Sequence, residues 1–338
     1  MAKKIERRSF LKTTGAAVAG AALFSNLGDS QAQAETPAQK SKVYFSRDLS
    51  YEGLLALYAK VNQGMSGKIG IKLHTGEPNG PNLLPIDFIK GLQAEIPNSN
   101  IVECNVLYPS TRQNADTHRQ TIATNGFDFC PVDIMDEEGD AMLPIAGMQE
   151  IIEAQGSGSE SVTLTEGQHY AEVAVGKNLL NYDSLLVYTH FKGHAMGGFG
   201  GSLKNIAIGC ASGKVGKRMI HGDDWVRGPL FLERMVEAGK GITDHFGEKI
   251  TYINVLKNIS VDCDCDAHGA PPSCSDIGIL ASTDILAIDQ ASVDMIYAMP
   301  KKDKRAMVVR IESRQGLHQL THMKALGMGN ADYELINI

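Results

Sequence analysis

Apolar and polar positions alternate between two periods along most of the chain. Short runs such as Ser184–Thr189 are almost continuously apolar and have the length of buried strands, whereas Val226–Phe246 repeats its apolar residues with a helical period. Strands alternating with helices are typical of an α/β fold with a mostly parallel sheet, helices on both faces and one large domain. The expected strands are 68–74, 101–106, 184–189, 250–256 and 277–281, and the expected helices are 85–96, 116–125, 226–246 and 284–298.

Residues that favour helix ends support these assignments. Pro85 stands in the first turn of one predicted helix, Gly126 directly follows another, and Asp284 is a suitable N-cap for a third. The Gly- and Ser-rich stretch 155–159 predicts a flexible loop or a lobe boundary. The charged run 301–305 follows a proline and predicts a solvated turn.

The first 34 residues have the three parts of a secretory signal peptide. Arg7 and Arg8 open a basic segment that continues into Phe-Leu-Lys, an Ala- and Gly-rich apolar stretch covers 15–27, and Ala32–Ala34 is an A-x-A cleavage pattern. Paired arginines in this context resemble the twin-arginine class. We expect the twin-arginine translocase to export the chain, to the periplasm or an equivalent compartment, and residues 35–338 to form a single α/β domain.

Composition and charge exclude several classes of protein. The chain has 338 residues, 43% of them hydrophobic, and a formal net charge of −7, which argues against a disordered protein and against a nucleic-acid-binding one. Removal of the basic leader makes the remainder more acidic. We therefore expect neither nucleic acid nor a stable membrane association among its partners.

The segment Thr189–Asn205 is the most unusual part of the chain. It follows a predicted strand and holds five glycines, two histidines and two lysines. Glycines let the backbone approach a ligand closely, and the loop after a strand of a parallel sheet is the usual ligand site. The spacing fits neither a P-loop nor a dinucleotide fingerprint. The segment is therefore either a ligand-binding loop or a tight structural turn.

This segment, with Gly209–Ser212, resembles the family known as domain of unknown function 362. The resemblance extends to residues 68–74, 114–119, 262–265, 276–282 and 287–291. Many members of that family carry an inserted ferredoxin-like segment with closely spaced cysteines. Residues 221–247, where that insertion is expected, contain no cysteine, so we do not expect an iron–sulfur cluster.

A more distant resemblance is to nickel-pincer lactate racemases, whose motif is similar to His194–Lys204 with Gly in place of Ala at 197 and of Ser at 200. The resemblance covers only their N-terminal domain. It implies a catalytic His194, a cofactor-anchoring Lys204 and a second acid–base residue at His118, before Arg119. It also implies a metal ligand at His221 and a cofactor cradle that includes Gly198, Gly200 and Gly201.

Three cysteines form a second candidate site. Cys263, Cys265 and Cys274 lie within twelve residues, near Asp262, Asp266 and His268. Thiolates beside carboxylates and imidazole suit zinc or another soft cation. The alternative is a disulfide from Cys274 to Cys263 or Cys265. The other cysteines, Cys104, Cys130 and Cys210, are expected to be small buried residues.

Other histidines complete the candidate chemistry. His74 opens the stretch His74–Glu77 after a predicted strand, so it either lines the same crevice as His194 or belongs to a structural turn. His318 and His322 share a helix face, which favours a partly buried or solvated surface over a metal site.

Two hypotheses of function follow from these features. In the first, the chain is a metal-dependent enzyme, of isomerase or oxidoreductase type, that acts on a small anionic molecule; its metal is nickel, zinc or iron. Lys204 holds the anion there, and His118 and His194 move protons. In the second, it is a non-catalytic metal or redox module defined by Cys263, Cys265 and Cys274.

Overall fold

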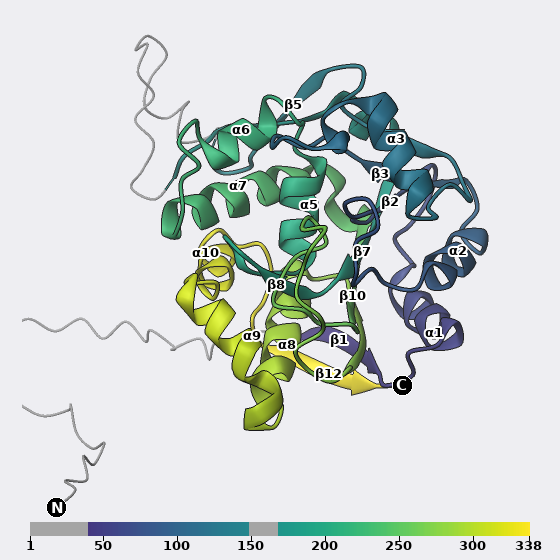
Figure 1. The fold of residues 1–338 in the computed structure, drawn as a ribbon, viewed down its shortest axis with the longest axis vertical. Helices are drawn as coiled ribbons and strands as arrows, with labels where there is room; N and C mark the ends of the chain where they lie inside the picture. The colour runs from purple at the N-terminus through teal and green to yellow at the C-terminus, as the bar shows by residue number, and fades with distance from the viewer. Residues whose placement is uncertain (1–39, 149–167) are drawn as a thin grey trace, which may run out of the picture. The chain divides into compact units, whose positions relative to one another are not determined.

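An eight-stranded sheet forms the centre of this computed structural model, which describes residues 40–148 and 168–338 (Figure 1). Its strand order is β12-β1-β11-β10-β7-β2-β3-β4, and only β11 runs antiparallel to its neighbours. The strands are β1 (Ser41–Ser46), β2 (Ile69–Lys72), β3 (Ser99–Glu103), β4 (Val132–Ile134), β7 (Ser184–His190), β10 (Ile250–Leu256), β11 (Gly278–Ser282) and β12 (Tyr333–Asn337). The predicted mostly parallel α/β fold is confirmed. The signal segment and the stretch 155–159 lie outside the described residues.

Helices cover both faces of this sheet. They are α1 (Tyr51–Val61), α2 (Ile86–Ala94), α3 (Ala115–Thr124), α5 (Ser202–Cys210), α6 (Gly216–His221), α7 (Pro229–Phe246), α8 (Ile285–Ala298), α9 (Lys301–Ser313) and α10 (His318–Ala325). Helices α1 and α2 lie on one face, and α5 and α8 lie on the other, with α7 packed outside α5 (Figure 1).

Strand β7 shows why its sequence is apolar throughout. Leu185 and Val187 point into the core shared with α5 and α8, whereas Leu186 and Tyr188 point into the core shared with α1 and α2. Successive side chains of a strand alternate between faces, so a strand covered on both sides needs apolar residues at every position.

The glycine-rich segment is more structured than a loop. It forms a hairpin of β8 (Lys192–His194) and β9 (Gly198–Gly200) and then enters α5. Asp289 of α8 accepts the backbone N–H groups of Ser202 and Leu203 at 2.7 and 2.9 Å, which satisfies the first turn of α5. Burial raises the pKa of this carboxyl to about 6 even though these hydrogen bonds oppose the shift. A second small sheet pairs β5 (Asp140–Pro144) with β6 (Glu172–Gly176).

One local prediction is wrong. The charged run 301–305 is not a turn but the start of α9, with Pro300 as its N-cap. Met307 and Ile311 bury one face of that helix, while Lys301, Lys302 and Arg305 stay exposed. The sparse apolar face explains why a helical period was not visible in the sequence.

No helix among the described residues is both long and apolar enough to span a membrane.

Replacing Leu186 by Ala tests the two-sided burial of β7. The side chain is fully buried, so we expect Leu186→Ala to lower the free energy of unfolding by about 2–5 kcal/mol through lost apolar burial and the cavity left behind. Chemical denaturation measures this loss. Leu335→Ala on β12, where the leucine is 39% exposed, is the control and should cost less than about 1 kcal/mol. Equal losses in the two variants would contradict the assignment.

Candidate functional site

A cavity of about 310 Å³ lies where several strands of the sheet end. Strands β2, β3 and β7 contribute residues at or just beyond their carboxyl ends, and α5, α6 and the segment after β10 complete its wall. In an open parallel sheet this edge is where ligands bind. Among the sequence-predicted site residues, the lining includes His74, His194, Lys204, Gly200, Gly201, His221 and Cys265.

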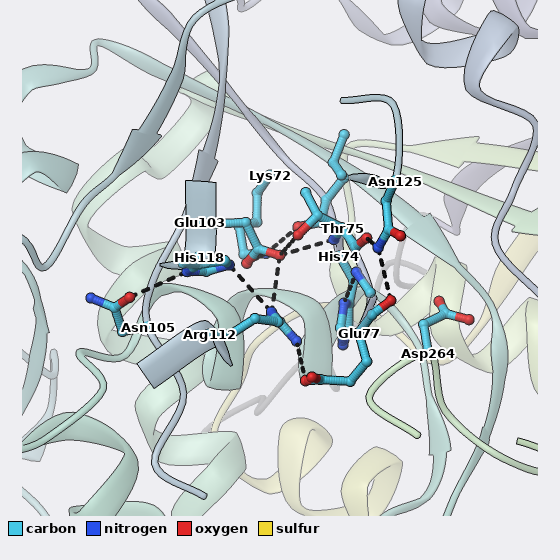
Figure 2. Close-up of polar contacts among 12 residues, drawn as sticks. Lys72, His74, Thr75, Glu77, Glu103, Asn105, Arg112, His118, Asn125 and Asp264 are labelled. Atoms are coloured by element: carbon cyan, nitrogen blue, oxygen red, sulfur yellow. Dashed lines mark hydrogen bonds and ion pairs between the residues drawn. The ribbon is translucent and has the colours of Figure 1, made fainter. Parts of the chain in front are cut away.

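Glu103, the last residue of β3, organises one side of the cavity (Figure 2). Its carboxylate is 2.9 Å from the Lys72 ammonium and 3.4 Å from the Arg112 guanidinium, and it accepts the backbone N–H of Thr75 at 3.0 Å. Burial alone would raise the pKa of Glu103, but Lys72 and Arg112 hold it far below its ordinary range. The carboxylate therefore stays ionised and fixes both cations and the turn that carries His74.

His118 contacts Arg112 (Figure 2) and does not line the cavity. Its Nε2 accepts the Arg112 Nε–H at 3.2 Å, and its Nδ1 lies 3.2 Å from Asn105 Oδ1. Burial, with the charge of Arg112, lowers the pKa of His118 to about 3. Because both ring nitrogens are engaged and the residue is fully buried, His118 positions Arg112 and does not touch the cavity.

His194 lines the cavity, and its hydrogen bonds determine which ring nitrogen carries the proton. Its Nδ1 accepts the backbone N–H groups of Gly197 and Met196 at 2.9 and 3.2 Å. A neutral imidazole that accepts at Nδ1 carries its proton on Nε2. Burial, together with the nearby Lys204, lowers the pKa of His194 well below its ordinary value. His194 is therefore a neutral hydrogen-bond donor at physiological pH.

The cavity wall carries an excess of positive charge. Five cationic side chains line it against one carboxylate: Lys72, Arg112, Lys192, Lys204 and Lys217 against Glu103. Most of these cations have a fixed partner; Lys192 pairs with Asp264 at 2.8 Å, and Lys217 donates to the Ala211 carbonyl at 2.7 Å.

Lys204 is different from the other cations. Within the described part of the chain, no hydrogen bond or ion pair engages its ammonium group. Its charge contributes to lowering the pKa values of His194, His221 and the Cys263 thiol, so it lies within electrostatic reach of all three. The Lys204 ammonium is therefore available to form a charge-assisted hydrogen bond with an anion in the cavity.

His74, Cys263 and Cys265 bring one ligand atom each to within 4.8 Å of one another. A hydrogen bond from Cys265, with the charges of Lys204 and Lys192, lowers the pKa of the Cys263 thiol, against the effect of burial. Burial and the charge of Arg112 lower the pKa of His74, so its imidazole is neutral. Two sulfurs and a neutral imidazole at this spacing are a suitable ligand set for a soft or borderline cation.

Several predicted residues lie apart from this cluster. Cys274 packs near the Ile259 carbonyl, and all six cysteines are free thiols. His221 lines the cavity but stacks on Phe231, with ring centroids 5.1 Å apart. Gly198 does not line the cavity; it adopts a φ of +79°, and a Cβ there would meet the backbone of Gly316 at 2.9 Å.

His318 and His322 lie outside the cavity, on α10, with stacked rings. Glu233 of α7 bridges His318 and His169 at 2.8 and 2.9 Å. Glu233 thus joins α7 to α10 and to the segment before β6 through partly buried polar contacts.

Comparison with known proteins places the chain in a family. Residues 69–294 match the family model described as domain of unknown function (DUF362). The chain belongs to this family. Residues 4–24 match the twin-arginine translocation pathway signal sequence, which confirms the predicted export by the twin-arginine translocase.

Two solved structures are similar to this DUF362 protein. One is the lactate racemase apoprotein from Thermoanaerobacterium thermosaccharolyticum, with a TM-score of 0.40, 11% identity, and coverage of 76% of this chain and 57% of that one. The other is a structural-genomics protein from Thermotoga maritima, with a TM-score of 0.39, 13% identity, and coverage of 79% and 59%. The chain thus spans less than two thirds of either. No curated protein matches the sequence.

Sequence reasoning missed the charged residues that hold the site together. Glu103 and Arg112 belong to no sequence motif, and Asp264 is distinguished only by its place between Cys263 and Cys265. A signal did exist, because Lys72 and Glu103 each directly follow apolar strand residues, Ile71 and Val102, and buried charges require partners.

His118→Gln tests the buried, neutral state of His118. The unfolded residue titrates near pH 6.5 and the native one near 3, so between these values only the unfolded chain takes up the proton and stability falls as pH falls. Such a group contributes at most about 1.4 kcal/mol per pH unit. We expect His118→Gln to flatten the dependence of unfolding free energy on pH between 6 and 4 by about 1 kcal/mol per unit. The exposed His268→Gln is the control, and an unchanged slope in His118→Gln would contradict the assignment.

Proposed function

We propose that this exported DUF362 protein is a metal-dependent enzyme that acts on a small organic anion. The observation that carries the proposal is the convergence of His74, Cys263 and Cys265 at a cavity whose wall also presents the unpaired Lys204.

The ligand set supports a catalytic metal. Zinc, nickel and iron all accept thiolate and imidazole ligands. Three protein ligands leave a coordination position open, which is the pattern of catalytic zinc sites rather than of closed structural ones. His74 and Cys265 line the cavity, so a metal held by these residues would lie beside the space where a substrate would bind. A metal bound there would supply a Lewis acid that polarises a substrate oxygen.

The cavity charges support an anionic substrate. The Lys204 ammonium is the free partner for a carboxylate, while Glu103 and Asp264 neutralise the neighbouring cations. His194 donates from Nε2 and stabilises a substrate oxygen on which negative charge develops. Arg112, held by Glu103 and Glu77, adds fixed positive potential on the same wall.

The residues fit the nickel-pincer arrangement only in part. Lys204, His194 and His221 line one cavity, as that resemblance implies. His118 is engaged at both ring nitrogens and does not line the cavity. His194 and His118, the two acid–base residues that this resemblance implies, therefore do not face one cavity. We derive no step through a pincer group.

One observation favours a second candidate, a thiol redox module. His74 Nδ1 accepts the Gly76 backbone N–H at 2.9 Å, so in this state the ring proton is on Nε2, the nitrogen otherwise free for a metal. In that form, Cys263 and Cys265 would exchange two electrons and two protons with a dithiol or disulfide partner. Metal binding through Nε2 would require that nitrogen to lose its proton. Metal binding through Nδ1 would require the hydrogen bond from Gly76 to break.

Metal content of the purified exported protein tests the proposal. After zinc loading and removal of loose metal, we expect one tightly bound zinc per chain. Cys263→Ser and Cys265→Ser should weaken zinc affinity at least 10-fold, because each removes a thiolate ligand.

Cys274→Ser is the matched control and should retain zinc, because Cys274 lies outside the cluster. Retention of zinc by both cluster variants, or its loss from Cys274→Ser, would overturn the assignment. A Cys263–Cys265 disulfide in protein that binds no zinc would favour the redox module.

A further inference from the structure

An aromatic wall borders the cavity beside Lys204. His221 stacks on Phe231, and the Trp225 ring lies against His221 with centroids 4.6 Å apart. His221 and Phe231 are buried, whereas Trp225 is 38% exposed although it lines the cavity. The indole is therefore the accessible end of this stack.

The backbone holds Trp225 in this place at an energetic cost. Its φ is +52°, a region that residues other than glycine rarely adopt. The neighbouring Val226 N–H donates to the His221 carbonyl at 2.8 Å, which closes the loop between α6 and α7. Strain of this kind concentrates at ligand-binding sites, and here it brings a large flat side chain to a cavity wall.

Positive charge lies next to these rings. Lys204 lines the same cavity as Trp225 and His221, and its charge contributes to lowering the pKa values of His221, His194 and the Cys263 thiol. An anionic group bound to Lys204 is thus within reach of both the aromatic wall and the thiol cluster. The cavity lining also includes the apolar side chains of Met196 and Ile208.

The size of the cavity exceeds what a two- or three-carbon acid needs. About 310 Å³ is at the lower end of the roughly 300–1,000 Å³ range of sites for drug-sized ligands. A ligand that fills this cavity has an apolar body in addition to its charged group.

We infer that the organic anion bound in this cavity carries a flat aromatic or conjugated ring, which packs on Trp225 while its carboxylate pairs with Lys204. This inference rests on the proposed function, because it assigns the substrate class of the same cavity. Aromatic rings pack in offset or edge contacts with centroids roughly 4.5–7 Å apart, and an indole at the cavity wall offers a face and an edge for such a contact.

Trp225 is the sole tryptophan of the chain, so intrinsic fluorescence reports on this site directly. The probes are 3-phenylpropionate, propionate and the neutral 3-phenylpropionamide, titrated into zinc-loaded protein. We expect 3-phenylpropionate to change the fluorescence and to bind at least 10-fold more tightly than either of the other two. Equal affinities for 3-phenylpropionate and propionate, or no binding of 3-phenylpropionate, would overturn the inference.

Variants of Trp225 and Lys204 test which residue binds the ring and which binds the carboxylate of the probe. Calorimetry measures the affinities. Trp225→Ala should weaken 3-phenylpropionate at least 5-fold and leave propionate unchanged, while Trp225→Phe should retain most of the affinity. Lys204→Met should weaken both carboxylates, and the exposed Lys214→Met should weaken neither. Equal weakening of both carboxylates by Trp225→Ala would contradict ring recognition.

Metal content measured on the same samples separates the two claims. Full zinc occupancy with no preference for the ring rejects this inference and leaves the metal centre standing. Zinc absent from a protein that still prefers 3-phenylpropionate rejects the metal-dependent function and leaves the ring site standing.

Discussion

The charged side of the cavity depends on a buried carboxylate that pairs two buried cations. Glu103 is the centre of this arrangement, because its carboxylate holds Lys72, Arg112 and the Thr75 backbone at once. Removing one partner of a buried ion pair leaves an uncompensated charge, which is far more costly than the pair itself is favourable. The carboxylate also fixes the turn after β2, and with it the direction from which His74 approaches Cys263. The His74, Cys263 and Cys265 cluster and the charged wall are thus one connected structure.

The opposite part of the site is held by a second buried carboxylate. Asp289 accepts the first N–H groups of α5 and lies so close to Gly201 that a Cβ there would meet its Oδ1 at 2.4 Å. This contact explains a glycine that the resemblance assigned to a cofactor cradle. It sets the position of the first turn of α5, and therefore of Lys204, relative to the strand ends.

The sequence predicts the sheet better than the site. Strand β10 has the predicted bounds and β7 differs by one residue, because strands buried on both faces are continuously apolar. The glycine-rich segment also lines a crevice at the strand ends, as predicted. These features depend on local composition, which a single sequence displays directly.

The partners of those residues come from distant parts of the chain. His74 joins Cys263 across 189 positions, where the spacing of cysteines alone had suggested Cys274. The residues next to His118 in the sequence match the position of a second acid–base histidine in the racemases. In the folded chain, however, Arg112 and Asn105 engage its two ring nitrogens. No sequence pattern indicated a role for Trp225. Its place in the cavity wall depends on a strained loop and on a cavity that exists only in the folded chain.

The most direct test of the proposed metal centre is X-ray absorption spectroscopy of the zinc-loaded protein. The account predicts two sulfur ligands at about 2.3 Å and an imidazole nitrogen at about 2.0–2.1 Å, with both sulfurs lost in the Cys263→Ser, Cys265→Ser double variant. A zinc shell of nitrogen and oxygen alone, or a sulfur shell that persists in the double variant, would contradict it.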